Sequence, residues 1–390
     1  MIRAMRAAVV VTTMHGGLLH YAVQLADGLA RRGHDVHVLA PRDNELSAHR
    51  GAARMRAVLE PPIRSAVLPA GRLAYLRRRV GVAVRLARAW LQVNVAARRG
   101  RYDAVVIAED LALPLAAAAV LALTLRPRRH TVAVVCHNVR PFNRWAGSEL
   151  FDASRLSTAL LGRLYPRCDT VFVHGEKSLA DFRATWPPTR VAVIPHGDER
   201  LLGDPAPPAD EERVLFFGDW RKVKGLSVLM EAFDALAGRR PAARLTIAGT
   251  PAPADYDPEL VRRWAAGHDG RVEIIDRYVP IGEVAPLFAR ARVVATPYLV
   301  GYQSGVIHLA MTMARAVVTS DVGDLPDAVR DGESGLVVPG GDAARLADAL
   351  EAVLADPALA ARMGDEGRRL VMSGSDWDAV AERFEAALDG

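Results

Sequence analysis

Three basic side chains lie directly after an apolar run in the segment Gly218–Gly225, which reads GDWRKVKG. The run 214–217 is typical of a buried strand, and a helix-like pattern begins at Gly225. Arg221 and Lys224 would then flank a helix start, where free amides and two cations can converge on a diphosphate. Lysines are scarce in this chain, so their position here favours a ligand site. A simple strand-to-helix connection is the alternative.

A second strand-to-helix connection contains a turn of sequence QSGV, formed by Gln303, Ser304, Gly305 and Val306. The first N–H groups of a helix have no partner within the helix, and the helix dipole adds to their attraction for anions. We therefore expect this turn to offer amides and a hydroxyl to the same phosphate as the basic loop. A buried connection without a ligand is the alternative.

Glycines also follow the first apolar run of the chain, in the sequence His15-Gly16-Gly17. Glycine lets the backbone approach a ligand closely and leaves amides accessible, so this turn could hold a phosphate or an acceptor. The spacing is not that of a GxGxxG dinucleotide fingerprint. A plain turn between a strand and a helix is the alternative interpretation.

His137 follows another apolar run, at residues 131–136. Open α/β sheets bind ligands at the carboxyl ends of their strands, and a side chain placed there faces that crevice. A histidine in this position could polarise a sugar hydroxyl, or hold a phosphate or a leaving group. A structural histidine with satisfied hydrogen bonds is the alternative.

The sequence does not indicate a metal site or a nucleophilic triad. No DxD motif stands at an expected strand end, Cys136 and Cys168 lack metal-ligand spacing, and no GxSxG elbow is present. Arginine, lysine and helix dipoles would then stabilise a leaving diphosphate in place of a metal. We expect no metal and no cofactor. Two cysteines without a disulfide framework favour a reduced, cytoplasmic compartment.

Strand-like and helix-like segments alternate along the whole chain, which favours α/β architecture with parallel sheets. A length of 390 residues suggests two domains of roughly 190 residues each. The Pro-rich, acidic stretch Gly203–Glu212 is the best candidate for a linker. We therefore place one domain over residues 1–200 and another over residues 201–375.

The formal net charge of +5 is unevenly distributed along the chain. Between Pro61 and Tyr102 there are ten arginines and no acidic residue. Apolar residues between them, such as Leu86 and Trp90, are typical of an amphipathic helix. Peripheral contact with an anionic membrane through Arg64–Arg101 is one interpretation, and a solvated arginine-rich helix is the other. No nucleic-acid-binding motif accompanies the arginines, so we do not expect nucleic-acid binding.

The order and spacing of these segments resemble glycosyltransferase family 4, which has the GT-B fold of two Rossmann-like domains facing an interdomain cleft. The resemblance covers almost the whole chain, and no single motif is decisive. It is carried by residues 16–36, 136–142, 171–178, 193–197, 216–226, 245–249, 303–306 and 321–329. The final segment, 376–390, resembles the helix that packs back on the N-terminal domain.

In that family the C-terminal domain binds a nucleotide sugar and the N-terminal domain binds the acceptor. The resemblance assigns donor binding to Gly218, Arg221, Lys224, Tyr278, Val279, Gln303, Ser304, Gly305 and Val306. Arg221 and Lys224 would hold the diphosphate, and Tyr278 and Val279 would contact the base. His137 matches a catalytic histidine that lines the crevice, and His15, Gly16 and Gly17 form the acceptor or phosphate loop. The usual pair of glutamates is absent, and its positions fall near Gly301 and Leu309.

The resemblance implies a retaining, metal-independent glycosyltransferase that uses a nucleoside-diphosphate sugar. The acceptor would be a glycan, a lipid-linked sugar or a small natural product. An epimerase or phosphorylase of the same fold is one alternative, and a non-catalytic partner protein with this fold is another. We expect a cytoplasmic protein, with a peripheral position at the inner face of the membrane as the alternative.

Overall fold

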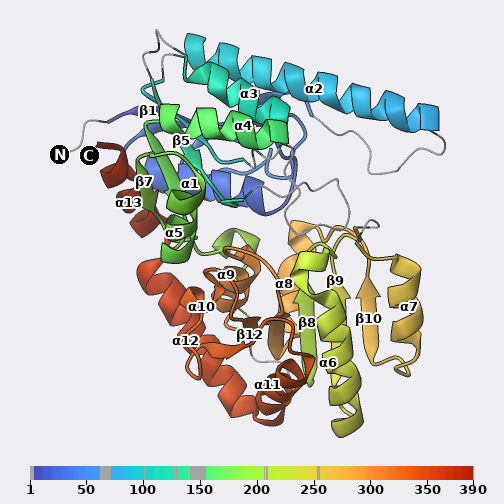
Figure 1. The fold of residues 1–390 in the computed structure, drawn as a ribbon. Coiled ribbons are helices and arrows are strands. Elements are labelled where there is room, and N and C mark those ends of the chain that lie inside the picture. Colours follow the sequence, from blue (N-terminus) through green and yellow to red (C-terminus); the bar gives the residue numbers. More distant parts are fainter. Residues whose placement is uncertain are drawn as a thin grey trace. The chain divides into compact units, whose positions relative to one another are not determined.

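The computed structural model describes residues 4–389 apart from 62–71, 101, 110, 112, 126–127, 129, 141–154, 206, 208–209 and 253–254. The described residues divide into two compact units (Figure 1). Unit 1 comprises the described residues before Asp198 together with those from Trp377 onward. Unit 2 comprises the described residues of Asp198–Asp376.

Unit 1 is built on a parallel seven-stranded sheet in the order β3-β2-β1-β4-β5-β6-β7. Its strands are β1 (Arg6–Val10), β2 (Asp35–Pro41), β3 (Arg54–Leu59), β4 (Ala104–Ile107), β5 (Thr131–Val135), β6 (Thr170–Val173) and β7 (Val191–Val193). Its helices are α1 (Gly17–Arg31), α2 (Arg72–Arg99), α3 (Pro114–Leu123), α4 (Arg155–Leu164), α5 (Glu176–Thr185) and α13 (Trp377–Asp389), with a 3₁₀ turn at Tyr165–Arg167. The central strands are continuous apolar runs, as expected where helices cover both faces.

The C-terminal helix α13 is part of unit 1 because it packs closely on α1. A Cβ added to Gly28 of α1 would lie 2.4 Å from the carbonyl oxygen of Trp377, so only glycine permits this approach. The Arg32 guanidinium pairs with the buried Glu385 at 2.5 Å. Phe384 stacks on Phe172 of β6 with ring centroids 4.1 Å apart. Helix α13 is therefore anchored both to a helix and to the sheet of unit 1.

Unit 2 is built on a parallel six-stranded sheet in the order β10-β9-β8-β11-β12-β13. Its strands are β8 (Arg213–Phe217), β9 (Arg244–Ala248), β10 (Val272–Ile275), β11 (Val293–Thr296), β12 (Ala316–Ser320) and β13 (Gly335–Val338). Its helices are α6 (Leu226–Arg239), α7 (Pro258–Ala266), α8 (Ile281–Ala289), α9 (Gly305–Thr312), α10 (Leu325–Ala328), α11 (Ala343–Ala355) and α12 (Pro357–Gly374). Short 3₁₀ turns occur at Arg200–Leu202 and Lys222–Lys224.

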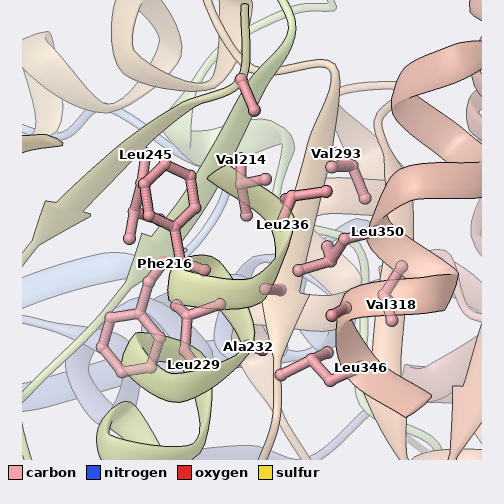
Figure 2. Close-up of a cluster of buried hydrophobic side chains, with 14 of the residues drawn as sticks. Val214, Phe216, Leu229, Ala232, Leu236, Leu245, Val293, Val318, Leu346 and Leu350 are labelled. Carbon is pink, nitrogen blue, oxygen red and sulfur yellow. The ribbon is translucent and has the colours of Figure 1, made fainter. Parts of the chain in front are cut away.

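The sheet of unit 2 has a hydrophobic core on each face, because side chains alternate along each strand. Val214 and Phe216 of β8 point into the core beneath α6 and α11, while Leu215 belongs to the opposite core. Figure 2 shows Leu229 and Leu236 of α6 meeting Leu346 and Leu350 of α11 over Val293 and Val318 of the sheet. This packing holds the strand ends of β8, β11 and β12 in fixed positions.

The predicted α/β fold with two parallel-sheet, Rossmann-like domains is confirmed. In each unit the strand order reverses at one point, between β1 and β4 in unit 1 and between β8 and β11 in unit 2. Open α/β sheets bind ligands outside the carboxyl ends of the strands at this reversal. The loops after β1, β4, β8 and β11 are therefore the places to search for a site. No helix in the described part of the chain is both long enough and apolar enough to cross a membrane.

Candidate functional site

The loop after β8 begins with a close backbone approach to the loop after β9. Gly218 has φ 126° and Gly249 has φ 144°, conformations that favour glycine. A Cβ on Gly249 would lie 1.9 Å from the Gly218 carbonyl oxygen. The Trp220 N–H donates to the Thr250 carbonyl at 2.9 Å, which is a second backbone contact between the two loops. The predicted donor residue Gly218 therefore lies in a tightly held turn.

The same loop ends by packing on the loop after β11, across the point where the strand order reverses. Gly225 immediately precedes α6 in a left-handed conformation with φ 68°. A Cβ at this position would lie 1.8 Å from the Pro297 carbonyl oxygen, which excludes any other residue without movement of the backbone. The Leu299 N–H donates to the Val223 carbonyl at 2.8 Å. Glycine at 225 is therefore what allows the two loops to meet.

Lys224 is connected to the start of α9 through a buried tyrosine. The Lys224 ammonium lies 3.7 Å from the ring centroid of Tyr298, a cation–π geometry. Tyr298 is 1% exposed, and its hydroxyl lies 3.0 Å from the Ser304 hydroxyl at the N-cap of α9. Among the described residues, the Gly305 and Val306 N–H groups have no acceptor. A cation and two unpaired amides thus stand at the carboxyl edge of one sheet.

A third loop, after β12, contacts the segment that immediately precedes the QSGV turn. Gly323 has φ 60°, and a Cβ there would lie 1.9 Å from the Gly301 carbonyl oxygen. The Asp324 N–H donates to the Tyr302 carbonyl at 2.8 Å. The Ser320 hydroxyl donates to the Tyr298 carbonyl at 2.6 Å. Three loops therefore support one another, and the start of α9 is pre-organised.

Arg221 is engaged within the protein. Its Nε lies 3.8 Å from the Oδ2 of Asp255, whose side chain is 9% exposed. The same oxygen accepts a hydrogen bond from the Lys222 N–H at 3.2 Å. Asp255 belongs to the loop after β9 and was not predicted from the sequence. A phosphate bound by Arg221 would share this guanidinium with Asp255.

The other predicted donor residues occupy different environments within unit 2. The Tyr278 carbonyl accepts from the Arg277 guanidinium at 3.2 Å, and Val279 is 5% exposed in the hydrophobic core. A contact between Val279 and a base would therefore use its backbone. The Gln303 Oε1 is buried and has no partner among the described residues. Leu309 is 2% exposed and packs in the same core as Val279, so its side chain is committed to packing.

The loop after β1 in unit 1 already donates a hydrogen bond to a carboxylate of the protein itself. The Gly16 N–H donates to the Glu45 Oε1 at 2.5 Å, and the His20 Nε2 lies 2.7 Å from the same oxygen. A Cβ added to Gly16 or Gly17 would meet nothing within 4 Å. His15 is exposed. A phosphate bound by the Gly16 amide would have to displace the Glu45 carboxylate.

A second carboxylate accepts hydrogen bonds from the start of the same loop. Glu109, two residues after β4, is 7% exposed. Its Oε2 accepts hydrogen bonds from the Thr12 N–H at 2.5 Å, the Thr12 hydroxyl at 2.8 Å and the Thr13 N–H at 3.1 Å. The point of strand reversal in unit 1 is therefore occupied by a protein carboxylate that the sequence analysis did not identify.

His137 lies in a cluster of buried aromatic side chains at the ends of β5, β6 and β7. His174 and His196 join it, and Tyr21 of α1 makes edge contacts with all three rings at centroid distances of 4.8–5.4 Å. Burial, with a smaller contribution from the neighbouring His196, lowers the pKa of His174 to about 3. His174 is therefore neutral at neutral pH. The same strand-end rule that selected His137 could have identified the other two histidines.

The hydrogen bonds of His174 define the proton positions in this cluster. A carbonyl oxygen can only accept, so the His174 Nδ1, 3.2 Å from the Ile194 oxygen, must carry the proton. The Nε2 of neutral His174 is then an acceptor, and the His137 Nδ1 donates to it at 3.1 Å. His137 therefore keeps a proton on Nδ1, and its Nε2 is the atom that differs between the neutral and charged forms.

The structure brings the predicted residues together in two groups, the donor residues in unit 2 and the remainder in unit 1. Within the residues that the structure describes, no group of three or more His, Cys, Asp or Glu side chains is arranged to hold a metal ion. The residues that sequence reasoning missed are mainly partners of predicted ones. They are Glu45, Glu109, His174, His196, Asp255 and Tyr298.

Solved structures that are similar to this chain over almost its whole length define the class of protein. Sucrose-phosphate synthase from Thermosynechococcus elongatus superposes with a TM-score of 0.74 at 23% identity, covering 98% of each chain. HepE of Anabaena, solved in complex with UDP, gives a TM-score of 0.70 at 17% identity over 99% of this chain and 100% of that chain. The protein therefore has the GT-B glycosyltransferase fold.

Sequence comparison narrows the class to a family. Residues 15–197 match the model of Glycosyltransferase Family 4, and residues 211–356 match that of Glycosyl transferases group 1. The α-maltose-1-phosphate synthase of Mycobacterium tuberculosis is 30% identical over 278 residues, covering 64% of this chain and 70% of that protein. The D-inositol 3-phosphate glycosyltransferase of Corynebacterium efficiens is 29% identical over 276 residues, 66% of this chain and 63% of that protein. The chain belongs to the group 1, family 4 glycosyltransferases, and the predicted family is confirmed.

Proposed function

We propose that this glycosyltransferase takes its sugar from a nucleoside-diphosphate sugar bound to unit 2. The observation that carries the proposal is the link from Lys224 through Tyr298 to Ser304 at the start of α9. This link places the Lys224 ammonium and the unpaired amides of Gly305 and Val306 at the carboxyl edge of the unit 2 sheet. A diphosphate carries the charge and the oxygen acceptors that such a group of donors can satisfy.

The same donors would stabilise the leaving diphosphate without a metal. Negative charge develops on the leaving phosphate as the glycosidic bond breaks, and pre-organised cations and amides favour that charge. The three interlocked loops support this role because they hold the donors before the substrate arrives. We infer that the reaction retains anomeric configuration by front-face attack, with the leaving phosphate helping to accept the acceptor proton.

The acceptor would bind to unit 1, with His137 among its contacts. The His137 Nδ1 donates to His174, and we infer that the other ring nitrogen, Nε2, contacts an acceptor hydroxyl. Two relatives are named for α-maltose-1-phosphate and for D-inositol 3-phosphate. Phosphorylated sugars and polyols are therefore the first acceptors to test, before glycans, lipid-linked sugars and natural products.

A ligand screen followed by a transfer assay tests this function. UDP is the first candidate because HepE was solved with it, and GDP, dTDP and ADP complete the set. The matching nucleotide should raise the melting temperature, and the rise should grow with the logarithm of its concentration above the dissociation constant. Transfer from its sugar should continue with EDTA present, and NMR of the product should show the donor's anomeric configuration.

Three results would contradict the proposal. Loss of transfer in EDTA, restored by a divalent metal, would remove metal independence, and an inverted product would remove retention. An epimer or a sugar phosphate formed without an acceptor would replace transfer by a different reaction of the same fold. Because each result concerns one element of the proposal, the remaining elements can still be tested separately.

A further inference from the structure

Among the described side chains of helix α2 in unit 1, the buried ones lie along one side. The buried positions among its described side chains form one stripe: Leu86, Ala89, Trp90, Val93 and Ala97. The Asn94 amide donates to the Ala119 carbonyl of α3 at 3.2 Å, and the Arg98 guanidinium donates to the Ala122 carbonyl, also at 3.2 Å. The C-terminal half of α2 is therefore fixed against α3.

The opposite side of α2 exposes a row of apolar side chains. Val80, Val84, Leu91 and Val95 are 56%, 45%, 64% and 38% exposed. Intervals of four and seven residues place these side chains on one face of a helix. They make up half of the exposed large hydrophobic residues of the described chain, although single exposed apolar residues are ordinary. A stripe of four on one helix face is a candidate docking surface.

Arginines accompany this stripe, and acidic residues do not. Arg77 and Arg88 are exposed on the same face, and Arg98 and Arg99 are exposed at its C-terminal end. No acidic residue occurs between Pro61 and Tyr102. The Arg88 guanidinium lies 3.9 Å from the Glu60 carboxylate and is still 65% exposed. The surface is therefore both apolar and strongly basic.

We propose that the exposed face of α2 docks on the surface of an anionic lipid bilayer. An interfacial helix buries its apolar stripe among acyl chains while flanking arginines contact lipid phosphates. A second copy of this chain is disfavoured as the occupant, because pairing two such faces would bring arginines together. Of the wider segment predicted from the sequence, Arg64 and Arg101 lie outside the described residues. The docking surface is independent of the donor chemistry of unit 2.

Vesicle flotation with the full chain tests the proposal. Vesicles of phosphatidylcholine alone should retain little protein, and vesicles with about 30% phosphatidylglycerol should retain most of it. Raising the salt to about 0.5 M should release the protein, because screening weakens the attraction to lipid phosphates. Equal binding to both vesicle types, or no binding to either, would overturn the proposal.

Paired variants assign the binding to α2. Arg77→Gln with Arg88→Gln should lower the partition coefficient about thirtyfold, from about fivefold per charge near the surface. Leu91→Ser should lower it about tenfold through lost apolar burial. The matched controls are Arg163→Gln with Arg183→Gln, which removes two exposed charges elsewhere in unit 1, and Leu156→Ser, which changes an exposed leucine of α4.

The variants also distinguish lipid from the other occupants. All of the changed side chains are exposed, so unchanged circular dichroism and melting temperature should accompany the loss of binding. Controls that reduce binding as much as the α2 variants would overturn the assignment. A dimer in sedimentation velocity that Leu91→Ser dissociates, with unchanged vesicle binding, would identify a second copy as the occupant instead.

Discussion

Two loops of this protein share one sequence pattern and differ in what fills them. Each follows the strand at which the order of its sheet reverses, and each runs through glycine to a helix. In unit 1 the amides of Thr12, Thr13 and Gly16 donate to carboxylates of the protein itself. In unit 2 the corresponding loop contributes Lys224, and the neighbouring α9 offers amides without a protein acceptor among the described residues.

The difference shows that a glycine-bearing turn can bind an external anion only when its amides do not already donate to a carboxylate of the protein. Unit 1 satisfies its loop internally with Glu45 and Glu109, so that loop is stable without a ligand. In unit 2 the loop carries the Lys224 ammonium, and the proposed diphosphate would supply the matching negative charge. The local sequence alone did not separate the two loops, because the carboxylates come from residues 29 and 97 positions away.

The largest effect that this comparison predicts is at Gly225. Gly225→Ala requires a left-handed alanine and places a Cβ 1.8 Å from the Pro297 oxygen. We expect a loss of about 3 kcal/mol or more in the free energy of unfolding, measured by urea denaturation. The loop contact, and with it nucleotide binding, should be lost together.

Two alanine variants are the controls for Gly225→Ala. Gly17→Ala in the loop of unit 1 meets nothing within 4 Å, and Gly238→Ala within α6 meets nothing either. Neither should destabilise the protein, and Gly238→Ala should stabilise it by about 0.5–1 kcal/mol through helix propensity. If Gly225→Ala behaves like these two, the close packing of the unit 2 loops is wrong.

Removal of the internal anion of unit 1 is the next largest effect. Glu109→Ala leaves the Thr12 and Thr13 amides without their acceptor, and we expect a loss of about 2–3 kcal/mol in stability by urea denaturation. Glu382→Ala, which changes an exposed carboxylate of α13, should have little effect. Unchanged stability in Glu109→Ala, together with new phosphate binding, would mean that the unit 1 loop is itself a ligand site.

The buried histidine cluster predicts a smaller effect, which depends on pH. The pKa of His174 is about 3 in the folded chain, whereas the ordinary pKa of an exposed histidine, as in the unfolded chain, is 6.5. Between these values the unfolded chain binds more protons, so His174 makes stability fall as the pH is lowered from 6.5 towards 3. The slope from one such group is at most about 1.4 kcal/mol per pH unit. The groups that face it are His137, His196 and Tyr21.

His174→Gln isolates this contribution. Urea denaturation at neutral and mildly acidic pH should show a weaker pH dependence in the variant than in the wild type. His15→Gln, which removes an exposed histidine, is the matched control. Equal pH dependence in His174→Gln and in the wild type would show that His174 is not held neutral by burial.

Much of the fold could be predicted because its signals are local. The apolar runs at 214–217 and 131–136 form β8 and β5, since each is a short apolar run between turn residues. Helix α1 begins at Gly17, so the second glycine of the predicted loop is already part of the helix, and Gly16 is its N-cap. Strand β3 was not predicted, because it alternates arginine with apolar residues at the edge of the sheet.

The site could be predicted only in part, for a physical reason. Glycines and lysines at strand ends are visible in the sequence, and they located the loop of Lys224. The partners of these residues come from distant positions in the sequence. The Lys224 ammonium makes a cation–π contact with Tyr298, and the Arg221 guanidinium pairs with Asp255. Such contacts depend on which strands are neighbours in the sheet, and that order is a property of the fold.

Titration of the Lys224 site by calorimetry tests the central claim most directly. Lys224→Met keeps an unbranched side chain over the Tyr298 ring and removes the charge, and Lys222→Met removes an exposed charge two residues away. Lys224→Met should weaken binding of the matching nucleoside diphosphate about tenfold or more, with affinity for the nucleoside unchanged. Lys222→Met should bind both as the wild type does. Wild-type diphosphate affinity in Lys224→Met would contradict the account.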